Sequence, residues 1–316
     1  MDMIYANGSG IELGYLTGYG LDLDIGDTND FEISLKTDNA ILDYDYRVYA
    51  NGTEYGGIVK EIKVDTAAEK ITYSGQTWRG MLENYILSPA TGEDYLTLGG
   101  YVTDIIMTLL TWFDLQSVYS VEPCSISVDN YQFDRYCTLL GGITKMLKSI
   151  NYRLNISCTN GIVTLAPVPV YDYSDELEYS QDCNLDFKIT DSRNGINHLV
   201  CLGSGELKAR QVINLYLQAD GTIGKTQYYT GIDERAAVYD YASVESLAEL
   251  EKSGREKFAE LLDSQELEMS IDEINVELGD IVGGRERITG IYMAQPITQK
   301  IVKITDGKLK ISYKVG

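Results

Sequence analysis

The spacing of apolar residues changes along the chain, from a period of two to a period near 3.6 and back. Over residues 1–75 short apolar runs alternate with polar residues, as in FEISL at 31–35, which is typical of strands with one buried face. Two further runs flank Asn51 and Gly52, a dipeptide that favours a tight hairpin turn. The segment 1–75 is therefore predicted to form a meander of short β-strands.

The middle of the chain follows helical spacing. In QTWRGMLENYIL (76–87) apolar residues recur at i, i+3, i+4, i+7 and i+8, which predicts an amphipathic helix. The same spacing predicts a second helix over 102–113 and a third over about 134–150. Gly141 and Gly142 lie inside the third helix, where each glycine lowers helix propensity by about 1 kcal/mol.

A β-hairpin is predicted at 152–168, around Asn160 and Gly161, so residues 76–182 form a small α/β domain. Its last residues, 171–182, are acidic and lack a clear period, which favours a linker. Strand patterns return over 183–217 and again over 269–316. Between them a helix is predicted at about 236–264, with Ser253 and Gly254 as its weak point.

These patterns predict an α+β, β-rich fold in three domains: 1–75, 76–182 and 183–316. Composition agrees, because 25 tyrosines against 5 phenylalanines favour strands with half-wet faces. A length of 316 residues allows two or three domains with cores of their own. No apolar run approaches the length of a membrane-spanning helix and the N-terminal residues lack a signal-peptide pattern, so neither a membrane anchor nor secretion is expected.

The net charge is −22, from 26 basic and 48 acidic residues. Such a chain repels phosphate and is not expected to bind nucleic acid tightly. The acidic loop DLDIGDTND (22–30) superficially resembles a calcium-binding loop, but it lacks the DxDxDG order and the glutamate at position 12. We interpret it as an acidic surface loop. The 48 acids leave a pair of catalytic carboxylates possible, although none lies in a distinctive local pattern.

Cysteine and histidine content argues against a zinc site. His198 is the single histidine, lies in an apolar strand context, and is interpreted as a structural residue. The odd number of cysteines and the absence of CxxC spacing predict reduced, partly buried thiols made in a cytoplasm. The five cysteines are Cys124, Cys137, Cys158, Cys183 and Cys201. We expect no catalytic, cofactor-binding or metal-binding residues and no cofactor.

ADGTIGKT (219–226) satisfies the permissive pattern of a phosphate-binding P-loop, with alanine in place of the first glycine. A P-loop needs a helix after it, because helix N–H groups hold the phosphate. The residues after Thr226 have no helical spacing, and Asp220 and Gly221 form a typical turn dipeptide. We interpret this stretch as a hairpin, and the partial glycine-loop match GSGEL (203–207) as a tight turn.

Three segments, taken in order, carry a resemblance. They are ITYSGQTWRGMLENYIL, NHLVCLGSGELKARQVINLYLQADGTIG and LGDIVGGRERITGIYMAQPITQKIVKITDGKLKISYKVG. Together they resemble the bacteriophage tail-hub family, especially the hub-type proteins of siphophage tails and prophages, whose relatives form the baseplate hub of contractile tails. The second segment carries most of the likeness, with a strand, GxGEL, a basic residue, and a strand ending in LYL-x-x-DG.

The resemblance implies two small β-barrel-like tail-tube domains that flank an α/β unit, and a non-enzymatic homotrimeric ring at the distal end of the tail tube. It implies a virion tail protein assembled in the host cytoplasm. Its partners would be the distal tail protein or tail tube, the tape measure protein, and fibre or receptor-binding proteins. DNA would pass through the ring during ejection without specific binding, past a lumen that some of the negative charge faces.

Two alternatives remain at this stage. One is a receptor- or carbohydrate-binding tail module that uses exposed tyrosine and tryptophan rings, although Trp78 and Trp112 lie on helical stripes that favour core packing. The other is an enzyme, either a P-loop NTPase or a wall-degrading hydrolase. Binding of the isolated chain to glycans would favour the first, and ATP binding or cleavage of cell walls would favour the second.

Overall fold

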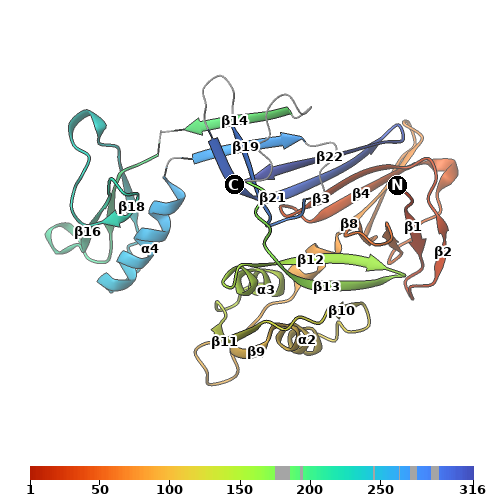
Figure 1. Ribbon diagram of the computed structural model, residues 1–316, viewed down its shortest axis with the longest axis horizontal. Coiled ribbons are helices and arrows are strands. Elements are labelled where there is room, and N and C mark those ends of the chain that lie inside the picture. The colour runs from red at the N-terminus through yellow and green to blue at the C-terminus, as the bar shows by residue number, and fades with distance from the viewer. Residues whose placement is uncertain (175–185, 193–194, 245, 263, 271–275, 286–291) are drawn as a thin grey trace. The chain divides into compact units, whose positions relative to one another are not determined.

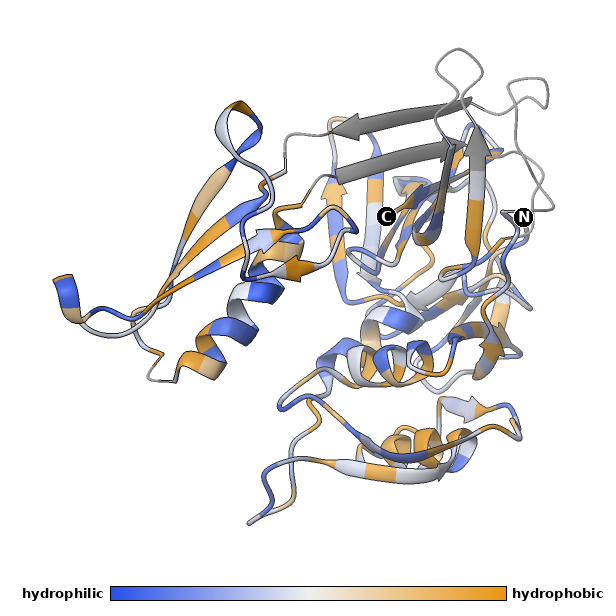
Figure 2. Cartoon of the chain, turned by 60° about the vertical axis from the view of Figure 1, so that its left-hand side comes forward, coloured by the Kyte–Doolittle hydropathy of each residue, from blue (hydrophilic) through white to orange (hydrophobic). Residues whose placement is uncertain are grey.

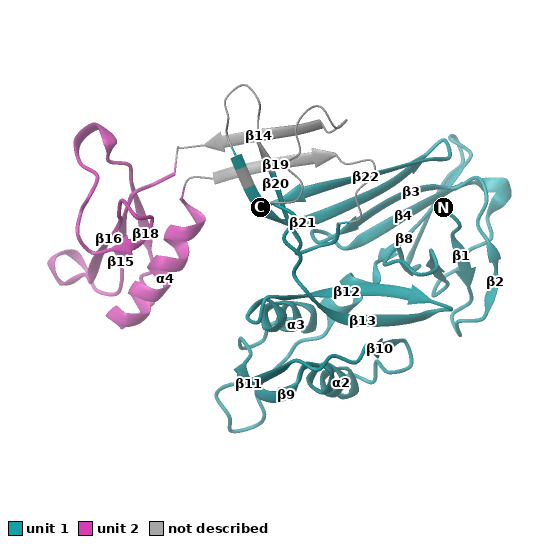
Figure 3. Ribbon diagram, in the orientation of Figure 1, with its two compact units in different colours: residues 1–187, 267–316 teal, residues 188–266 magenta. Residues whose placement is uncertain are grey.

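A computed structural model describes the chain except for residues 175–185, 193–194, 245, 263, 271–275 and 286–291 (Figure 1). The chain forms two compact units, which Figure 3 colours separately. Unit 1 contains residues 1–187 and 267–316, and unit 2 contains residues 188–266. Unit 2 is therefore one continuous segment inserted into the sequence of unit 1.

The fold class is α+β and β-rich, as the sequence predicts. The division into three domains at 75/76 and 182/183 stays a prediction. The two compact units divide the chain differently: residues 267–316 belong to the same unit as residues 1–187, because the C-terminal strands pair with strands of the N-terminal meander. The expected linker at 171–182 lies mostly outside the described residues; within it, Asp172 pairs with Ile281 as an isolated bridge.

Unit 1 begins with a small antiparallel sheet in the order β2-β1-β5-β6. Its strands are β1 (Ile4–Ala6), β2 (Glu12–Tyr15), β5 (Arg47–Tyr49) and β6 (Gly56–Ile58). The turn between β5 and β6 holds Asn51 and Gly52, and Gly52 has a φ of 75°, so this predicted hairpin is confirmed.

A larger antiparallel sheet of unit 1 combines both ends of the chain in the order β22-β21-β3-β4-β8-β7, with β19 beside β22 and β20 paired with β21. Its N-terminal strands are β3 (Gly20–Ile25), β4 (Asp30–Lys36), β7 (Glu61–Asp65) and β8 (Lys70–Gln76). Its C-terminal strands are β19 (Ser264–Ser270), β20 (Ile281–Arg285), β21 (Tyr292–Thr305) and β22 (Lys308–Val315).

The pairing of β3 with β21 places Leu23 opposite Val302 and so joins segments from near the two ends of the sequence. Both side chains are buried in one core, with Phe31, Ile33 and Tyr73 from β4 and β8. Burial of these apolar side chains explains why strands β3 and β4 alternate between buried and exposed positions.

The middle of unit 1 contains helices α2 and α3 and short strands around a second core. The elements are β9 (Thr97–Tyr101), α2 (Val102–Trp112), β10 (Tyr119–Val121), β11 (Ser127–Gln132), α3 (Leu139–Lys148), β12 (Tyr152–Thr159) and β13 (Ile162–Pro169). Helix α2, at the foot of Figure 2, is largely apolar and buries one stripe, as predicted for 102–113. The predicted hairpin at 152–168 is formed by β12 and β13, with Asn160 and Gly161 at positive φ.

The helix predicted over 76–87 is wrong in length. Only α1 (Trp78–Met81) and a 3₁₀ turn (Leu82–Asn84) form, because Tyr85 is extended and its carbonyl accepts a hydrogen bond from Leu139 N–H. The apolar side chains still reach the core, which is why the spacing resembles a helix. Helix α3 likewise begins at Leu139, after the cap residue Thr138, rather than at 134.

Unit 2 is a four-stranded sheet covered on one face by a helix. The sheet order is β17-β16-β15-β18, from β15 (His198–Leu202), β16 (Val212–Leu217), β17 (Ile223–Gly224) and β18 (Ala236–Asp240). Helix α4 (Leu247–Glu260) packs on Leu199, Cys201 and Leu215. Strand β14 (Asp186–Ser192) precedes this sheet in the sequence and spans the boundary between the units.

The helix predicted over 236–264 is therefore wrong at its start. Residues 236–240 form β18, parallel to β15, with Val238 opposite Val200. Alternating exposure along β18 is the strand signal that the longer helical pattern obscured. Gly254 does not break α4: a Cβ there would lie 2.6 Å from Cys201 Sγ, so the glycine allows close packing of helix on sheet.

Among the described residues, no helix has both the length and the apolar character needed to cross a membrane.

Candidate functional site

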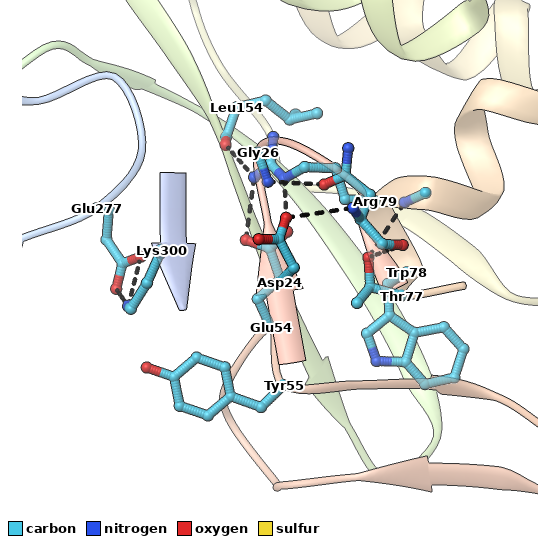
Figure 4. A network of polar contacts seen from close by, with 12 residues as sticks. Asp24, Gly26, Glu54, Tyr55, Thr77, Trp78, Arg79, Leu154, Glu277 and Lys300 are labelled. Atoms are coloured by element: carbon cyan, nitrogen blue, oxygen red, sulfur yellow. Dashed lines mark hydrogen bonds and ion pairs between the residues drawn. The ribbon is translucent and has the colours of Figure 1, made fainter. Parts of the chain in front are cut away.

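A tight strand-to-helix turn anchors a buried polar network in unit 1 (Figure 4). After β8, Thr77 caps α1 by accepting a hydrogen bond from Gly80 N–H at 3.2 Å, and its hydroxyl donates to the Asn29 carbonyl at 3.0 Å. A Cβ on Gly80 would lie 2.3 Å from the same carbonyl. This close approach fixes α1, and with it the direction in which Arg79 extends.

Arg79 forms a bidentate ion pair with Glu54 inside unit 1. The Nε–Oε1 distance is 2.6 Å and the Nη2–Oε2 distance is 3.0 Å, while Nη2 also donates to the Leu154 carbonyl at 3.1 Å. Both side chains are less than a tenth exposed. Burial raises the pKa of Glu54, and Arg79 opposes that rise. The pair connects the β5–β6 turn, α1 and β12.

A second ion pair joins the C-terminal strands to the same region. Lys300 Nζ lies 3.0 Å from both carboxylate oxygens of Glu277, and 5.1 Å and 5.7 Å from the ring centres of Tyr55 and Tyr313. Burial lowers the pKa of Lys300, but Glu277 and the two rings outweigh burial and leave it raised. Burial raises the pKa of Tyr313 to about 12.

A third ion pair, between Arg153 of β12 and Asp280, ties the middle of unit 1 to the segment before β20. Arg153 Nε donates to Asp280 Oδ1 at 2.7 Å, and the backbone N–H groups of Tyr171 and Glu277 also donate to this carboxylate. Asp280 is about 1% exposed, so three donors replace the water that its charge has lost.

The network thus joins the N-terminal strands, the α/β middle and the C-terminal strands of unit 1. Each charged side chain of the network is paired with one of opposite charge. Such pairs hold segments of the chain in fixed positions and do not activate a nucleophile. Among the described residues, no group of three or more histidine, cysteine or acidic side chains is arranged to hold a metal ion. Arg79 lies in the first of the three segments that carry the family resemblance, but no local sequence pattern predicts the pairing of Glu54, Glu277 or Lys300.

The predicted hairpin at ADGTIGKT is confirmed. Strands β16 and β17 pair on either side of Asp220 and Gly221, and Gly221 has a φ of 80°. Gly224 ends β17, and Lys225 pairs with Glu251 of α4 at 2.7 Å. No helix begins directly at Thr226, because the chain continues from there to a 3₁₀ turn at Gly231–Asp233 and then to β18. The stretch lacks the helix N-terminus that a P-loop requires.

His198 is a hydrogen-bonded residue of β15, in agreement with the structural interpretation. Its Nδ1 lies 2.7 Å from Glu234 Oε1, its Nε2 lies 2.9 Å from Asn214 Oδ1, and its ring stacks on Tyr216. Both ring nitrogens therefore form hydrogen bonds, and these connect β15 to Asn214 of β16 and to Glu234.

The acidic loop at 22–30 is held by bonds of its own. Asp24 Oδ1 accepts hydrogen bonds from the backbone N–H groups of Asp27 and Thr28 at 3.1 Å and 2.9 Å. Its other oxygen accepts from the side chain of Gln299 on β21. Asp22 pairs with Lys303 at 2.8 Å. The side chains of Asp24 and Asp22 therefore connect the loop and β3 to β21.

Four cysteines are free thiols: Cys124 and Cys137 are half-buried, and Cys158 and Cys201 are buried. Cys183 lies outside the described residues. Of the two tryptophans, Trp78 is fully buried as expected, whereas the expectation of a buried Trp112 is wrong. Trp112 is the last residue of α2 and is half exposed, whereas its neighbour Phe113 packs against the core.

Comparison with known proteins by sequence finds nothing: no family model matches the chain, and no curated protein matches it. Comparison by structure finds tail proteins. A tail protein from Neisseria meningitidis MC58 superposes with a TM-score of 0.54 at 15% identity, over 99% of this chain and 95% of that one. Prophage tail protein gp18 from Listeria monocytogenes EGD-e superposes with a TM-score of 0.52 at 16% identity, over 99% of this chain and 94% of that one.

The 43 kDa tail protein of prophage MuSo2 from Shewanella oneidensis gives a TM-score of 0.56 at 11% identity, over 100% of this chain and 98% of that one. The chain has the fold of these tail proteins. The likeness extends over nearly the whole of both chains in each comparison, so the tail-protein fold includes the inserted unit 2 as well as unit 1.

Proposed function

We propose that the chain is a structural component of a phage or prophage tail, and more specifically a hub that forms a ring at the distal end of the tail tube. The observation that supports this most strongly is the tail-protein fold, shared end to end with three tail proteins. The ion pairs of unit 1 support it too, because a ring subunit under mechanical load needs segments that keep their relative positions.

In this proposal three copies close a ring, each contributing two barrel-like domains, so that six similar domains match a hexameric tube. The ring anchors fibres or other baseplate proteins and surrounds the exit path of the tape measure protein and the DNA. Negative charge on the lumen keeps phosphates from adhering. The prediction for any structure of the assembled ring is a net negative lumen, and a net positive one would refute this part.

The decisive experiment is the oligomeric state of the purified chain with and without tail tubes. We expect light scattering after gel filtration to give three times the chain mass of 35.2 kDa, and electron microscopy to show threefold rings at tube ends. A chain that remains monomeric and does not bind to tubes would count against a hub.

The proposed hub has interfaces and no catalytic role. We therefore expect no ATP binding by the chain, and no difference between it and a Lys225→Ala variant, since Lys225 is paired with Glu251. Cell-wall zymograms with the chain are expected to be blank. ATP binding that depends on Lys225, or a cleared zone in the zymogram, would replace the structural proposal with an enzymatic one.

One observation supports a second candidate, a receptor- or carbohydrate-binding tail module: Trp112 and Tyr101, at the two ends of α2, are both at least half exposed. Exposed aromatic faces stack on sugar rings. Binding on a glycan array that is lost in Trp112→Ala, without assembly onto tubes, would favour this candidate. Tube binding that is unchanged in Trp112→Ala would favour the hub.

A further inference from the structure

A cavity of about 560 Å³ opens in unit 1 between α3, the start of β12 and the C-terminal strands. This volume is typical of sites for small ligands and short peptide segments. Most of its wall is apolar. The apolar part comes from Leu140, Leu154, Val170, Leu278, Ile281 and Ile297.

Helix α3 faces this cavity with a stripe of three exposed residues, Gly141, Thr144 and Lys148, spaced by three and four positions. The two adjacent glycines of α3 have different surroundings. A Cβ on Gly142 would lie 2.7 Å from Leu87 Cδ1, so this glycine closes the core. A Cβ on Gly141 would lie 2.9 Å from the hydroxyl of the cap residue Thr138 and near no core side chain, and Gly141 lines the cavity.

The charged side chains on the cavity wall are mainly cationic, although the whole chain carries −22. Arg79, Lys148 and Arg153 line it together with Glu83, which accepts a hydrogen bond from Asn29, and with Gly316. Arg79 is already paired with Glu54 and Arg153 with Asp280, so Lys148 is the lining cation without an ion pair among the described residues. Arg153 bonds to Asp280 through Nε, and its Nη1 has no hydrogen-bond partner within the described part of the chain.

Lys148 is exposed, and the described residues give it no ion pair. Its neighbour Lys145 differs: it pairs with Asp134 at 2.5 Å and does not line the cavity. In a strongly acidic chain, an uncommitted lysine and a partly uncommitted arginine beside an apolar cavity select an anionic group attached to an apolar one.

We propose that this cavity binds a peptide segment that ends in an apolar residue with a free carboxylate. The apolar wall buries the last side chain, and Lys148 and Arg153 face the carboxylate. Thr144, Asn151 and Thr298 add hydroxyl and amide groups, which match peptide N–H and C=O groups and would find no partner on an acyl chain. The assignment of this segment to another tail protein rests on the proposed function. The inferred chemistry of the ligand rests only on the residues of the cavity.

Calorimetric titration of the purified full chain tests the ligand chemistry. The probes are acetyl-Gly-Ser-Gly-X peptides, with X as Leu, Ile, Val or Phe, each as free acid and as C-terminal amide, together with decanoate. We expect at least one free acid to bind, and its amide to bind about tenfold more weakly or not at all. No binding by any free acid, equal binding by the amide, or tighter binding by decanoate would overturn the proposal.

Variants of α3 locate the binding. Lys148→Glu reverses the charge at the wall and Thr144→Trp fills the cavity, so each is expected to weaken the free acid about tenfold or more. Lys145→Glu makes the same charge change on the same helix away from the cavity and should leave the affinity nearly unchanged. Equal losses in Lys148→Glu and Lys145→Glu would overturn the assignment to this cavity.

Circular dichroism and melting curves check that each variant is folded, and all three altered positions are exposed. The titrations use the isolated chain and do not depend on ring formation. Peptide binding by a chain that forms no ring would therefore refute the hub alone, and rings built from a chain that binds no peptide would refute the cavity proposal alone.

Discussion

At the scale of single residues, the Glu54–Arg79 pair is the contact whose loss should cost most. Arg79→Met would leave the buried Glu54 carboxylate without its cation, so we expect unfolding free energy to fall by about 3–5 kcal/mol. The double variant Glu54→Gln and Arg79→Met removes both charges and should recover part of this loss. Urea denaturation followed by circular dichroism measures all three proteins.

The exposed pair Lys60–Asp45 provides the control, because both side chains are about two thirds exposed. Lys60→Met should change the unfolding free energy by less than about 1 kcal/mol. If Arg79→Met were no more harmful than Lys60→Met, the buried network would not be what holds the segments of unit 1 together.

Cys158 leads to a second prediction at this scale. It is fully buried, and burial raises the pKa of its thiol to about 12. Because the neutral thiol is favoured in the folded chain, its contribution to stability is complete below pH 9 and is lost as the pH rises from 9 to 12. With iodoacetamide at pH 8, mass spectrometry should find half-buried Cys124 labelled well before Cys158. Equal labelling rates would mean that the β12 region opens readily.

At the scale of elements, α1 depends on its cap. Thr77→Ala removes the hydroxyl that accepts a hydrogen bond from Gly80 N–H and donates one to the Asn29 carbonyl. We therefore expect the free energy of unfolding to fall by about 1–2 kcal/mol. Thr77→Ser keeps the hydroxyl and should retain most of the stability. Thermal melts of the two variants measure the difference, and a Ser variant as unstable as the Ala variant would show that the methyl group, not the cap, matters.

Elements were predictable where the signal is local. Asn51-Gly52, Asn160-Gly161 and Asp220-Gly221 each form the predicted turn, since glycine adopts positive φ at no steric cost. Helix α2 was predictable because its stripe faces a single core. The helix expected over 76–87 was not, because Tyr85 serves as a strand-like partner for Leu139 and only the tertiary contact reveals this.

At the scale of the whole molecule, the sequence could indicate the fold class but not the pairing of its ends. Nothing local to β3 or β21 specifies that Leu23 faces Val302. Both strands merely alternate, and any apolar strand face would satisfy that pattern. The same holds for the cavity: the sequence shows Gly141 and Gly142 only as residues of low helix propensity, and only the fold shows that Gly142 packs against Leu87 whereas Gly141 lines the cavity.

Net charge gives the last prediction, which concerns the assembled ring. Three copies carry three times −22, or −66, so subunits repel one another except where ion pairs or apolar surfaces meet. Raising the salt concentration from about 0.1 M to about 1 M shortens the screening length from about 10 Å to about 3 Å, which weakens this repulsion. We therefore expect the rings to be more stable in high salt. In a dilution series followed by light scattering, they should stay assembled down to a lower protein concentration at about 1 M salt than at about 0.1 M salt. Rings that dissociate more readily in high salt would instead mean that ion pairs between subunits dominate the interface.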